Sequence, residues 1–410
     1  MAGAIAAIPD GARIYVAPTC AVPTALVEAI DAARDRWRRL EFVCDYLIEP
    51  LAVFDHPGEP FHHTSLQPSP AANAMRDANV LQTVPASYSQ FATLIAPNGP
   101  VAVDVALVQV SPPGPDGRFS LGVGGGATIE AVRATPLVIA EVNPQMPYTF
   151  GASEIDRDEI DLLVDVDHPL VELIVPEGNA TALAIGEHAA ALVADESVLQ
   201  FGIGAIPESI LGAISERRDL GLHGGMISDA IIDLVEVGAI TGARKNTDPG
   251  LMITAAVAGT RKCFDWVHRN KAIRVVPSSY SHGLAALSRV ENFVAINSAL
   301  EIAADGSVNA EMVGDRVLSG PGGQPDFAYA SWASPSGSSI IAMPSTAARG
   351  TVSRIVNQLG PGISPTIGRY LVDQVVTELG VARLRGLSIA ERREALAAVC
   401  HPDFRGPLLR

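Results

Sequence analysis

Short apolar segments alternate with longer segments rich in alanine and leucine along most of the chain. The short segments carry Val, Ile and Leu and end at turn residues, which is typical of buried strands, whereas the longer ones have helical spacing. The pattern predicts strands at residues 12–17, 39–48, 101–110, 137–142 and 197–201, and helices at residues 23–33, at 180–193 and from 207 onwards. Strands that alternate with helices predict α/β domains with parallel sheets.

Two regions interrupt this alternation. Residues 50–100 are richer in Pro, His, Asn and Ser and are expected to be mostly loop. The segment Pro176-Glu177-Gly178 is typical of a linker. At 410 residues the chain is long enough for two large domains. We therefore expect one open α/β domain at residues 1–178 and a second at residues 179–410.

Composition excludes several classes of protein. With 48% hydrophobic and 18% charged residues, the chain has more apolar surface to bury than a disordered chain carries. The formal net charge of −16 argues against a nucleic-acid partner but allows a local site for one anion. No membrane span or leader is expected, which predicts a cytoplasmic protein. No metal site is expected either, because the four cysteines lie far apart without zinc spacing: Cys20, Cys44, Cys263 and Cys400.

A glycine-rich turn lies between a predicted strand and a predicted helix, with the sequence Gly202-Ile-Gly-Ala-Ile-Pro207. Glycines there let the backbone turn tightly, and the helix start offers free N–H groups to an anion or a developing oxyanion. We place Pro207 at the first helical position. Gly202, Gly204 and Ala205 are therefore candidate ligand-binding residues, with a purely structural turn as the alternative.

Two further segments carry candidate chemistry. The segment Gly322-Gly-Gln-Pro-Asp-Phe327 has the residues of a ligand-binding loop, although a surface turn is equally consistent with it. In Leu220-Gly-Leu-His-Gly-Gly-Met-Ile-Ser-Asp229, His223 is a candidate base or a hydrogen-bonded structural residue. Ser228 and Asp229 precede an apolar run and are expected to cap a helix.

Together these segments resemble the acetyl-CoA hydrolase/transferase family, close to its 4-hydroxybutyrate CoA-transferases. The motifs occur in the family's order at residues 120–122, 141–143, 146–147, 200–207, 220–223, 322–327, 344–346, 375–378 and 401–405. The resemblance implies two α/β domains of the CoA-transferase type with the active site between them, and a homodimer or homotetramer. It implies coenzyme A thioesters, with a small carboxylate, as ligands. It also implies that the turn at Gly202, Gly204 and Ala205 is an oxyanion hole, and that the CoA-binding residues are Gly322, Gly323, Gln324, Asp326 and Phe327.

The chain departs from the family at the nucleophile. In such transferases a glutamate attacks the acyl-CoA carbonyl, forms a mixed anhydride and then a glutamyl-CoA thioester, which an acceptor carboxylate resolves. The resemblance puts Gly225 at the glutamate's position. Glycine has no side chain to form the anhydride, and removing a covalent nucleophile costs on the order of 10⁴–10⁶ in rate.

Three hypotheses follow from this departure. In the first, the protein hydrolyses or otherwise processes an acyl-CoA with activated water, and His223, Asp326 or Glu378 activates the water. In the second, it is a carboxylate CoA-transferase of the acetate or 4-hydroxybutyrate type that uses another carboxylate. In the third, it is an inactive CoA-thioester-binding subunit or sensor. Three arginines are candidates for CoA phosphates or an acceptor carboxylate, with ion pairing as the alternative: Arg76, Arg354 and Arg369.

Overall fold

The computed structural model describes residues 1–409 and divides the chain into two compact units. The first comprises residues 1–174 and 253–281, and the second comprises residues 175–252 and the chain from 282 onwards. The division at 174 lies close to the boundary expected after residue 178. The expected division into two continuous segments does not account for residues 253–281, which belong to the first unit.

A parallel sheet forms the centre of the first unit, in the order β4-β3-β2-β1-β5-β7-β9. Every neighbouring pair in it is parallel, which confirms the expected sheet type. The strands are β1 (Arg13–Val16), β2 (Leu40–Cys44), β3 (Phe61–Ser65), β4 (Leu81–Thr83), β5 (Val105–Val110), β7 (Leu137–Val142) and β9 (Leu162–Asp165). The chain order reverses between β1 and β5, as in doubly wound folds.

The remaining elements of this unit are α1 (Ala2–Ala7), α2 (Thr24–Ala32), α3 (Asn73–Asp77), α4 (Phe91–Ile95), α5 (Ala127–Ala134), β6 (Phe119–Ser120), β8 (Glu154–Ile155), β12 (Met252–Val257), α9 (Arg261–Val267), β13 (Ile273–Val275) and α10 (Ser278–Ser281). Most of residues 50–100 lie outside α-helices and strands, as expected, but the segment also contains the short elements β3, β4, α3 and α4. The strand expected from residue 101 begins only at Val105, because the Asp104 carboxylate accepts a hydrogen bond from the Arg13 backbone N–H at 2.8 Å.

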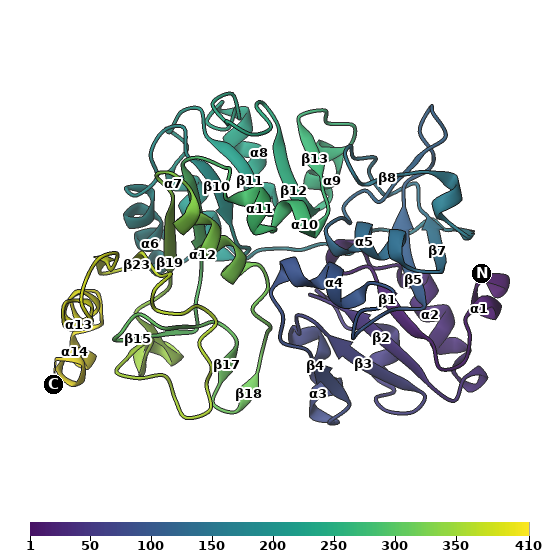
Figure 1. The fold of residues 1–410 in the computed structure, drawn as a ribbon, viewed down its shortest axis with the longest axis horizontal. Coiled ribbons are helices and arrows are strands. Elements are labelled where there is room, and N and C mark those ends of the chain that lie inside the picture. The colour runs from purple at the N-terminus through teal and green to yellow at the C-terminus, as the bar shows by residue number, and fades with distance from the viewer. Residues whose placement is uncertain (410) are drawn as a thin grey trace. The chain divides into compact units, whose positions relative to one another are not determined.

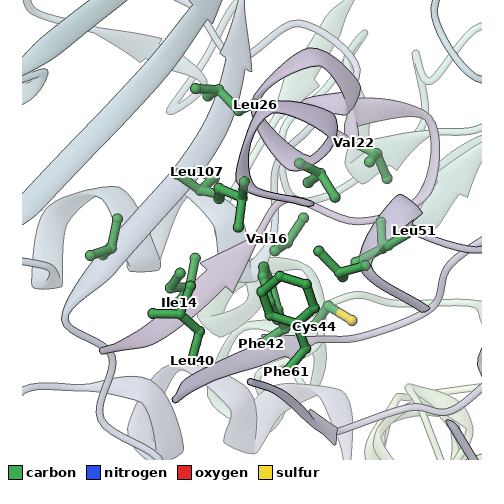
Figure 2. Close-up of a cluster of buried hydrophobic side chains, with 14 of the residues drawn as sticks. Ile14, Val16, Val22, Leu26, Leu40, Phe42, Cys44, Leu51, Phe61 and Leu107 are labelled. Atoms are coloured by element: carbon green, nitrogen blue, oxygen red, sulfur yellow. The ribbon is translucent and has the colours of Figure 1, made fainter. Parts of the chain in front are cut away.

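One face of this sheet carries a large apolar cluster. Figure 2 shows Phe42 of β2 and Phe61 of β3 within this cluster. Their ring centroids lie 5.6 Å apart, with the ring planes at 76°. Ile14 from β1 and Leu26 from α2 pack in the same cluster, and all four side chains are fully buried. Burying a side chain of this size stabilises the folded state by roughly 1.5–3 kcal/mol. This cluster therefore holds α2 against the sheet.

The second unit also contains an open sheet, of which Figure 1 labels β11, β10, β19 and β23. Its strands lie in the order β11-β10-β14-β19-β23-β24. All neighbours are parallel except β23 and β24. The strands are β10 (Val198–Phe201), β11 (Gly221–Ile227), β14 (Phe293–Asn297), β19 (Ser338–Ala342), β23 (Gln374–Thr377) and β24 (Gly380–Arg383). Here the chain order reverses between β10 and β14.

The helices of the second unit are α6 (Ala180–Ala190), α7 (Ala205–Ala213), α8 (Asp229–Glu236), α11 (Leu284–Leu287), α12 (Gln324–Ala333), α13 (Ile389–Ala398) and α14 (Arg405–Leu408). Its small sheets contain β15 (Glu301–Ala303), β16 (Val308–Asn309), β17 (Met312–Val313), β18 (Arg316–Val317), β20 (Thr346–Ala347), β21 (Val352–Ser353) and β22 (Ile355–Val356). The expected first helical position of Pro207 is wrong, because α7 starts at Ala205 and a proline is tolerated throughout the first turn. Within residues 1–409, no helix combines the length and the apolar character that a bilayer span requires.

Candidate functional site

The glycine-rich turn lies where the strand order of the second unit reverses. β10 ends at Phe201 just before the turn, and the adjacent strand β14 ends at Asn297. The side-chain amides of Gln200 and Asn297 join the two strand ends, with N···O distances of 3.1 and 3.5 Å. In open α/β sheets, ligands bind outside the carboxyl ends of the strands at such a reversal. The turn therefore lies at the edge of the sheet where a ligand site is expected.

Backbone geometry explains the second glycine of the turn. Gly204 has φ 125° and ψ 171°, a conformation that is essentially restricted to glycine, and it is the N-cap of α7. A Cβ atom added at Gly202 or Gly204 would meet no atom within 4 Å, so the space beside the turn is open. The Gly202 N–H already donates to the Ile296 carbonyl at 3.2 Å. The donors that the turn can offer are the N–H groups of Gly204, Ala205 and Ile206, which have no acceptor within the helix.

An imidazole that the sequence analysis did not single out lies beside Gly225. A Cβ atom added at Gly225 would lie 3.2 Å from His282 Nε2, and one added at Gly323 would lie 2.6 Å from the same nitrogen. The His282 ring therefore fills the space between strand β11 and the Gly322–Phe327 loop. It is 4% exposed, and burial, followed by the charge of His223, lowers the pKa of His282 to about 3.

The Gly322–Phe327 loop is attached to the same sheet edge. The Gln324 side chain donates to the Ser298 carbonyl, one residue beyond β14, at 2.8 Å. Gly322 has φ 54°, Gly323 is the N-cap of α12, and Asp326 lies in the first turn of that helix. The loop thus leads into α12 beside the end of β14. The glycine-rich turn contacts the same strand through the Gly202 N–H.

Phe327 lies in the core, although we expected it to contact a ligand. Its side chain is 3% exposed and belongs to an apolar cluster with Phe293. The ring centroid of Phe327 lies 4.5 Å from that of His282, with a tilt of 42°, and 6.2 Å from that of Phe293. Phe327 therefore supports the imidazole. His223 is also buried, at 1% exposure on β11.

The carboxylates near the site differ in their surroundings. Glu378 is half-buried and accepts hydrogen bonds from the Ser345 N–H at 2.9 Å and from the Ser345 hydroxyl at 2.5 Å. Glu208 lies in the first turn of α7, where burial, and then the charge of Asp229, raises its pKa. Ser228 is the N-cap of α8, as expected, but its side chain makes no capping hydrogen bond. Within residues 1–409, no group of three or more His, Cys, Asp or Glu side chains could hold a metal ion.

The three candidate arginines lie in different surroundings. Arg354 donates to the Ala299 carbonyl at 3.2 Å, two residues beyond β14, and burial lowers its pKa. Arg369 pairs with the Asp305 carboxylate at 2.8 Å, as expected of a surface ion pair. Arg76 lies in the first unit, at the end of α3. Of the two candidate arginines in the second unit, Arg354 is the one that contacts the chain just beyond β14.

His282 is absent from the sequence-based candidates because no motif surrounds it. It stands in Tyr280-Ser-His-Gly283, far from Gly225 along the chain, and only the fold brings the two together. Gln200 and Glu208 had a local signal, since both lie in or beside the glycine-rich turn. A polar side chain at the end of a buried strand can be read from sequence, whereas a tertiary contact cannot.

Comparisons with known proteins agree with this architecture. Residues 3–176 match the acetyl-CoA hydrolase/transferase N-terminal domain, and residues 259–410 match the corresponding C-terminal domain. The 4-hydroxybutyrate coenzyme A transferase of Clostridium kluyveri is 36% identical over 408 residues, which cover 99% of this chain and 95% of the relative.

Two solved structures cover 99% of this chain and 94% of their own. RipA from Yersinia pestis superposes with a TM-score of 0.90 at 30% identity. The 4-hydroxybutyrate CoA-transferase of Porphyromonas gingivalis superposes with a TM-score of 0.82 at 31% identity. With this identity and coverage, the chain belongs to the acetyl-CoA hydrolase/transferase family.

Proposed function

We propose that this protein is an enzyme that hydrolyses an acyl-CoA thioester by direct attack of water, without a covalent glutamyl intermediate. The observation that carries the proposal is the surroundings of Gly225. The position to which the family resemblance assigns the nucleophilic glutamate has no side chain, and the His282 ring lies 3.2 Å from where its Cβ would be. A site that retains donors for an oxyanion but has no carboxylate there suits attack by water.

The glycine-rich turn supplies the electrostatic part of the proposed reaction. A thioester carbonyl at the start of α7 would receive hydrogen bonds from the N–H groups of Gly204, Ala205 and Ile206. Negative charge develops on that oxygen as the carbonyl is attacked, and the positive end of the helix dipole stabilises it. The open space beside Gly202 and Gly204 gives the acyl group access to these donors.

The second glycine-rich segment is the proposed binding loop for the CoA moiety. Gly322 has a positive φ that favours glycine, and the start of α12 favours negatively charged groups. Gln324 keeps the loop at the end of β14 through its bond to the Ser298 carbonyl. Acyl-CoA is thus bound as a substrate, and the products are free CoA and a carboxylate. The acyl group itself follows from neither loop.

A panel of acyl-CoA thioesters, with and without acetate, tests the proposal. We expect thiol release, followed with a thiol-reactive dye, at a rate that does not depend on acetate, and one ¹⁸O atom from labelled water in the carboxylate product. New acyl-CoA formed only when acetate is present would support the transferase instead. Calorimetric binding of CoA without release or transfer across the whole panel would support an inactive binding protein.

A CoA-transferase that uses another carboxylate is the second candidate function, and Glu208 favours it. This carboxylate stands three residues after the proposed oxyanion donor Ala205, and its pKa is raised mainly by burial. Incubation with acyl-CoA followed by hydroxylamine should then give a hydroxamate at Glu208. The Glu208→Gln variant should lose the label, whereas Glu187→Gln on α6 should keep it. No labelled peptide in the wild type would reject this candidate.

We also propose a cytoplasmic homodimer or homotetramer, as the resemblance implies. Multi-angle light scattering of the purified chain distinguishes these states from a monomer.

A further inference from the structure

We propose that His282 is a catalytic residue of this site, the base that takes a proton from the attacking water in the space beside Gly225. The inference rests on the proposed hydrolysis and names the group that activates the water. It replaces the sequence-based candidates His223, Asp326 and Glu378 in that role.

The position of Nε2 is the first support. Of the three heavy atoms nearest to a Cβ added at Gly225, two belong to His282, namely Nε2 at 3.2 Å and Cε1 at 3.4 Å. At Gly323 the nearest atoms are Cδ2 at 2.5 Å and Nε2 at 2.6 Å. Nε2 is common to both sets, so this nitrogen faces both glycines. Both glycines are partly exposed, whereas the ring is buried. In the proposed reaction, water reaches Nε2 past the partly exposed Gly225, and any side chain at residue 225 would narrow that approach.

The packing of the ring is the second support. Phe327 packs against His282, and Phe293 lies behind Phe327, so the imidazole is held by buried aromatic rings. A base held in one orientation does not have to be ordered during the reaction. His223 is the titratable neighbour whose charge acts on His282, and together with burial it keeps the imidazole neutral. The imidazole is therefore in its basic form before the reaction. Its protonation becomes favourable only when the oxyanion charge develops nearby, which stabilises the transition state rather than the bound substrate.

The proton and electron pairs balance in this step. The water oxygen forms a bond to the thioester carbonyl carbon while one water proton moves to His282 Nε2, and the carbonyl oxygen becomes an oxyanion. The oxyanion collapses, the C–S bond breaks, and the CoA sulfur takes the proton from the imidazolium. The products are CoA thiol and a carboxylic acid, which ionises, and His282 returns to its neutral form.

The first variant that tests the role is His282→Gln, which keeps a polar side chain of similar length but cannot act as a base. We expect kcat for thioester hydrolysis to fall by about 100-fold or more, which is the usual contribution of a general base. KM and the Kd for CoA should change by less than threefold, since the turn and the loop that bind the ligand are unchanged. Circular dichroism and the melting temperature report whether the variant folds.

A second pair of variants keeps the test independent of the folding of His282→Gln. Gly225→Ala adds a methyl group 3.2 Å from Nε2, which needs only a shift of a few tenths of an ångström but fills the space for the water. Gly224→Ala is its matched control, because that methyl group would meet Gln200 Cγ at an ordinary 3.4 Å. We expect Gly225→Ala to lower kcat at least tenfold and Gly224→Ala to lower it less than threefold.

The outcomes separate this inference from the proposed function. Wild-type protein that releases no CoA from any thioester overturns the proposed function and the role of His282 with it. Wild-type hydrolysis with a folded His282→Gln variant that keeps half of kcat overturns the inference alone. Equal kcat values for Gly225→Ala and Gly224→Ala also overturn it. Loss of hydrolysis in both His282→Gln and Gly225→Ala, with CoA binding retained, supports it.

Discussion

Replacing Gly204 by alanine tests the backbone conformation of the glycine-rich turn without introducing a steric clash. A methyl group at either Gly202 or Gly204 meets no atom within 4 Å, so neither variant creates a clash. The two positions differ in φ, which is positive only at Gly204. A non-glycine residue in the conformation of Gly204 costs about 1–3 kcal/mol. Alanine at a compatible position such as Gly202 stabilises by about 0.4–1 kcal/mol, because it restricts the unfolded chain. The same gain applies to Gly204→Ala, so we expect Gly204→Ala to be less stable than Gly202→Ala by the strain alone, about 1–3 kcal/mol.

Urea unfolding followed by circular dichroism measures this difference, and hydrolysis of an acyl-CoA measures its effect on the site. If the Gly204→Ala turn relaxes rather than bearing the strain, the N–H groups of Ala205 and Ile206 move. The loss of one oxyanion donor lowers kcat by about 10²–10³-fold. Equal free energies of unfolding for the two variants, with wild-type kcat in Gly204→Ala, would refute the assignment of both the strain and the donors.

The structure predicts the direction of the effect of four further substitutions on stability or activity. Burial raises the pKa of Asp45 to about 7, above its unfolded value of 3.8, so the free energy of unfolding of the wild type should fall between about pH 4 and 7. Asp45→Asn should remove up to about 4 kcal/mol of that fall. Urea midpoints that change with pH in the same way in both proteins would contradict this. Gly323→Ala, with its methyl group 2.6 Å from His282 Nε2, should destabilise by about 1–3 kcal/mol in urea unfolding. Gly212→Ala, at an exposed position of α7 with free space around it, should stabilise by about 0.5–1 kcal/mol and raise the melting temperature. Gly225→Glu alone should give little acetate-dependent CoA exchange, because a glutamate side chain is larger than the space for one water next to His282 Nε2, whereas Gly225→Glu with His282→Ala should give exchange; equal exchange in both would contradict this.

Much of the fold follows from local sequence patterns, and the exceptions have a common cause. β7 and β10 are short, mostly apolar segments that end at turn residues, and this pattern predicts their bounds within one residue. β3 has the sequence Phe-His-His-Thr-Ser and carries no such pattern. It becomes a strand because β2 and β4 pair with it on both sides and its side chains fill the space beneath η3 (Ala52–Asp55), where Phe54 packs against His63. Pairing partners that are distant in sequence override local propensity there.

The same distinction between local sequence patterns and tertiary contacts applies to the candidate site. The Gly202–Ala205 turn and the Gly322–Phe327 loop are visible in the sequence because glycine next to a strand or helix start has a local backbone meaning. The direction of a side chain within such a loop is not visible in this way. Phe327 follows a ligand-like segment, yet one face of α12 must be buried, and Phe327 lies on it. No local sequence pattern marks His282, because its role depends entirely on which elements the fold brings beside it.

The two glycines that border His282 are not equivalent, and the difference indicates from which side a substrate reaches the ring. At Gly323 an added Cβ would lie 2.5–2.8 Å from atoms of His282 and Phe327, so the ring itself requires a glycine there whatever residue stands at 225. At Gly225 the shortest distance is 3.2 Å, which a small shift relieves. The packing of the ring therefore does not by itself account for a glycine on β11. A requirement for free space next to Nε2 does account for it, and water or the thioester carbonyl would then approach His282 from the β11 side. The missing side chain at residue 225 is, on this reasoning, part of the reaction site rather than only the loss of a nucleophile.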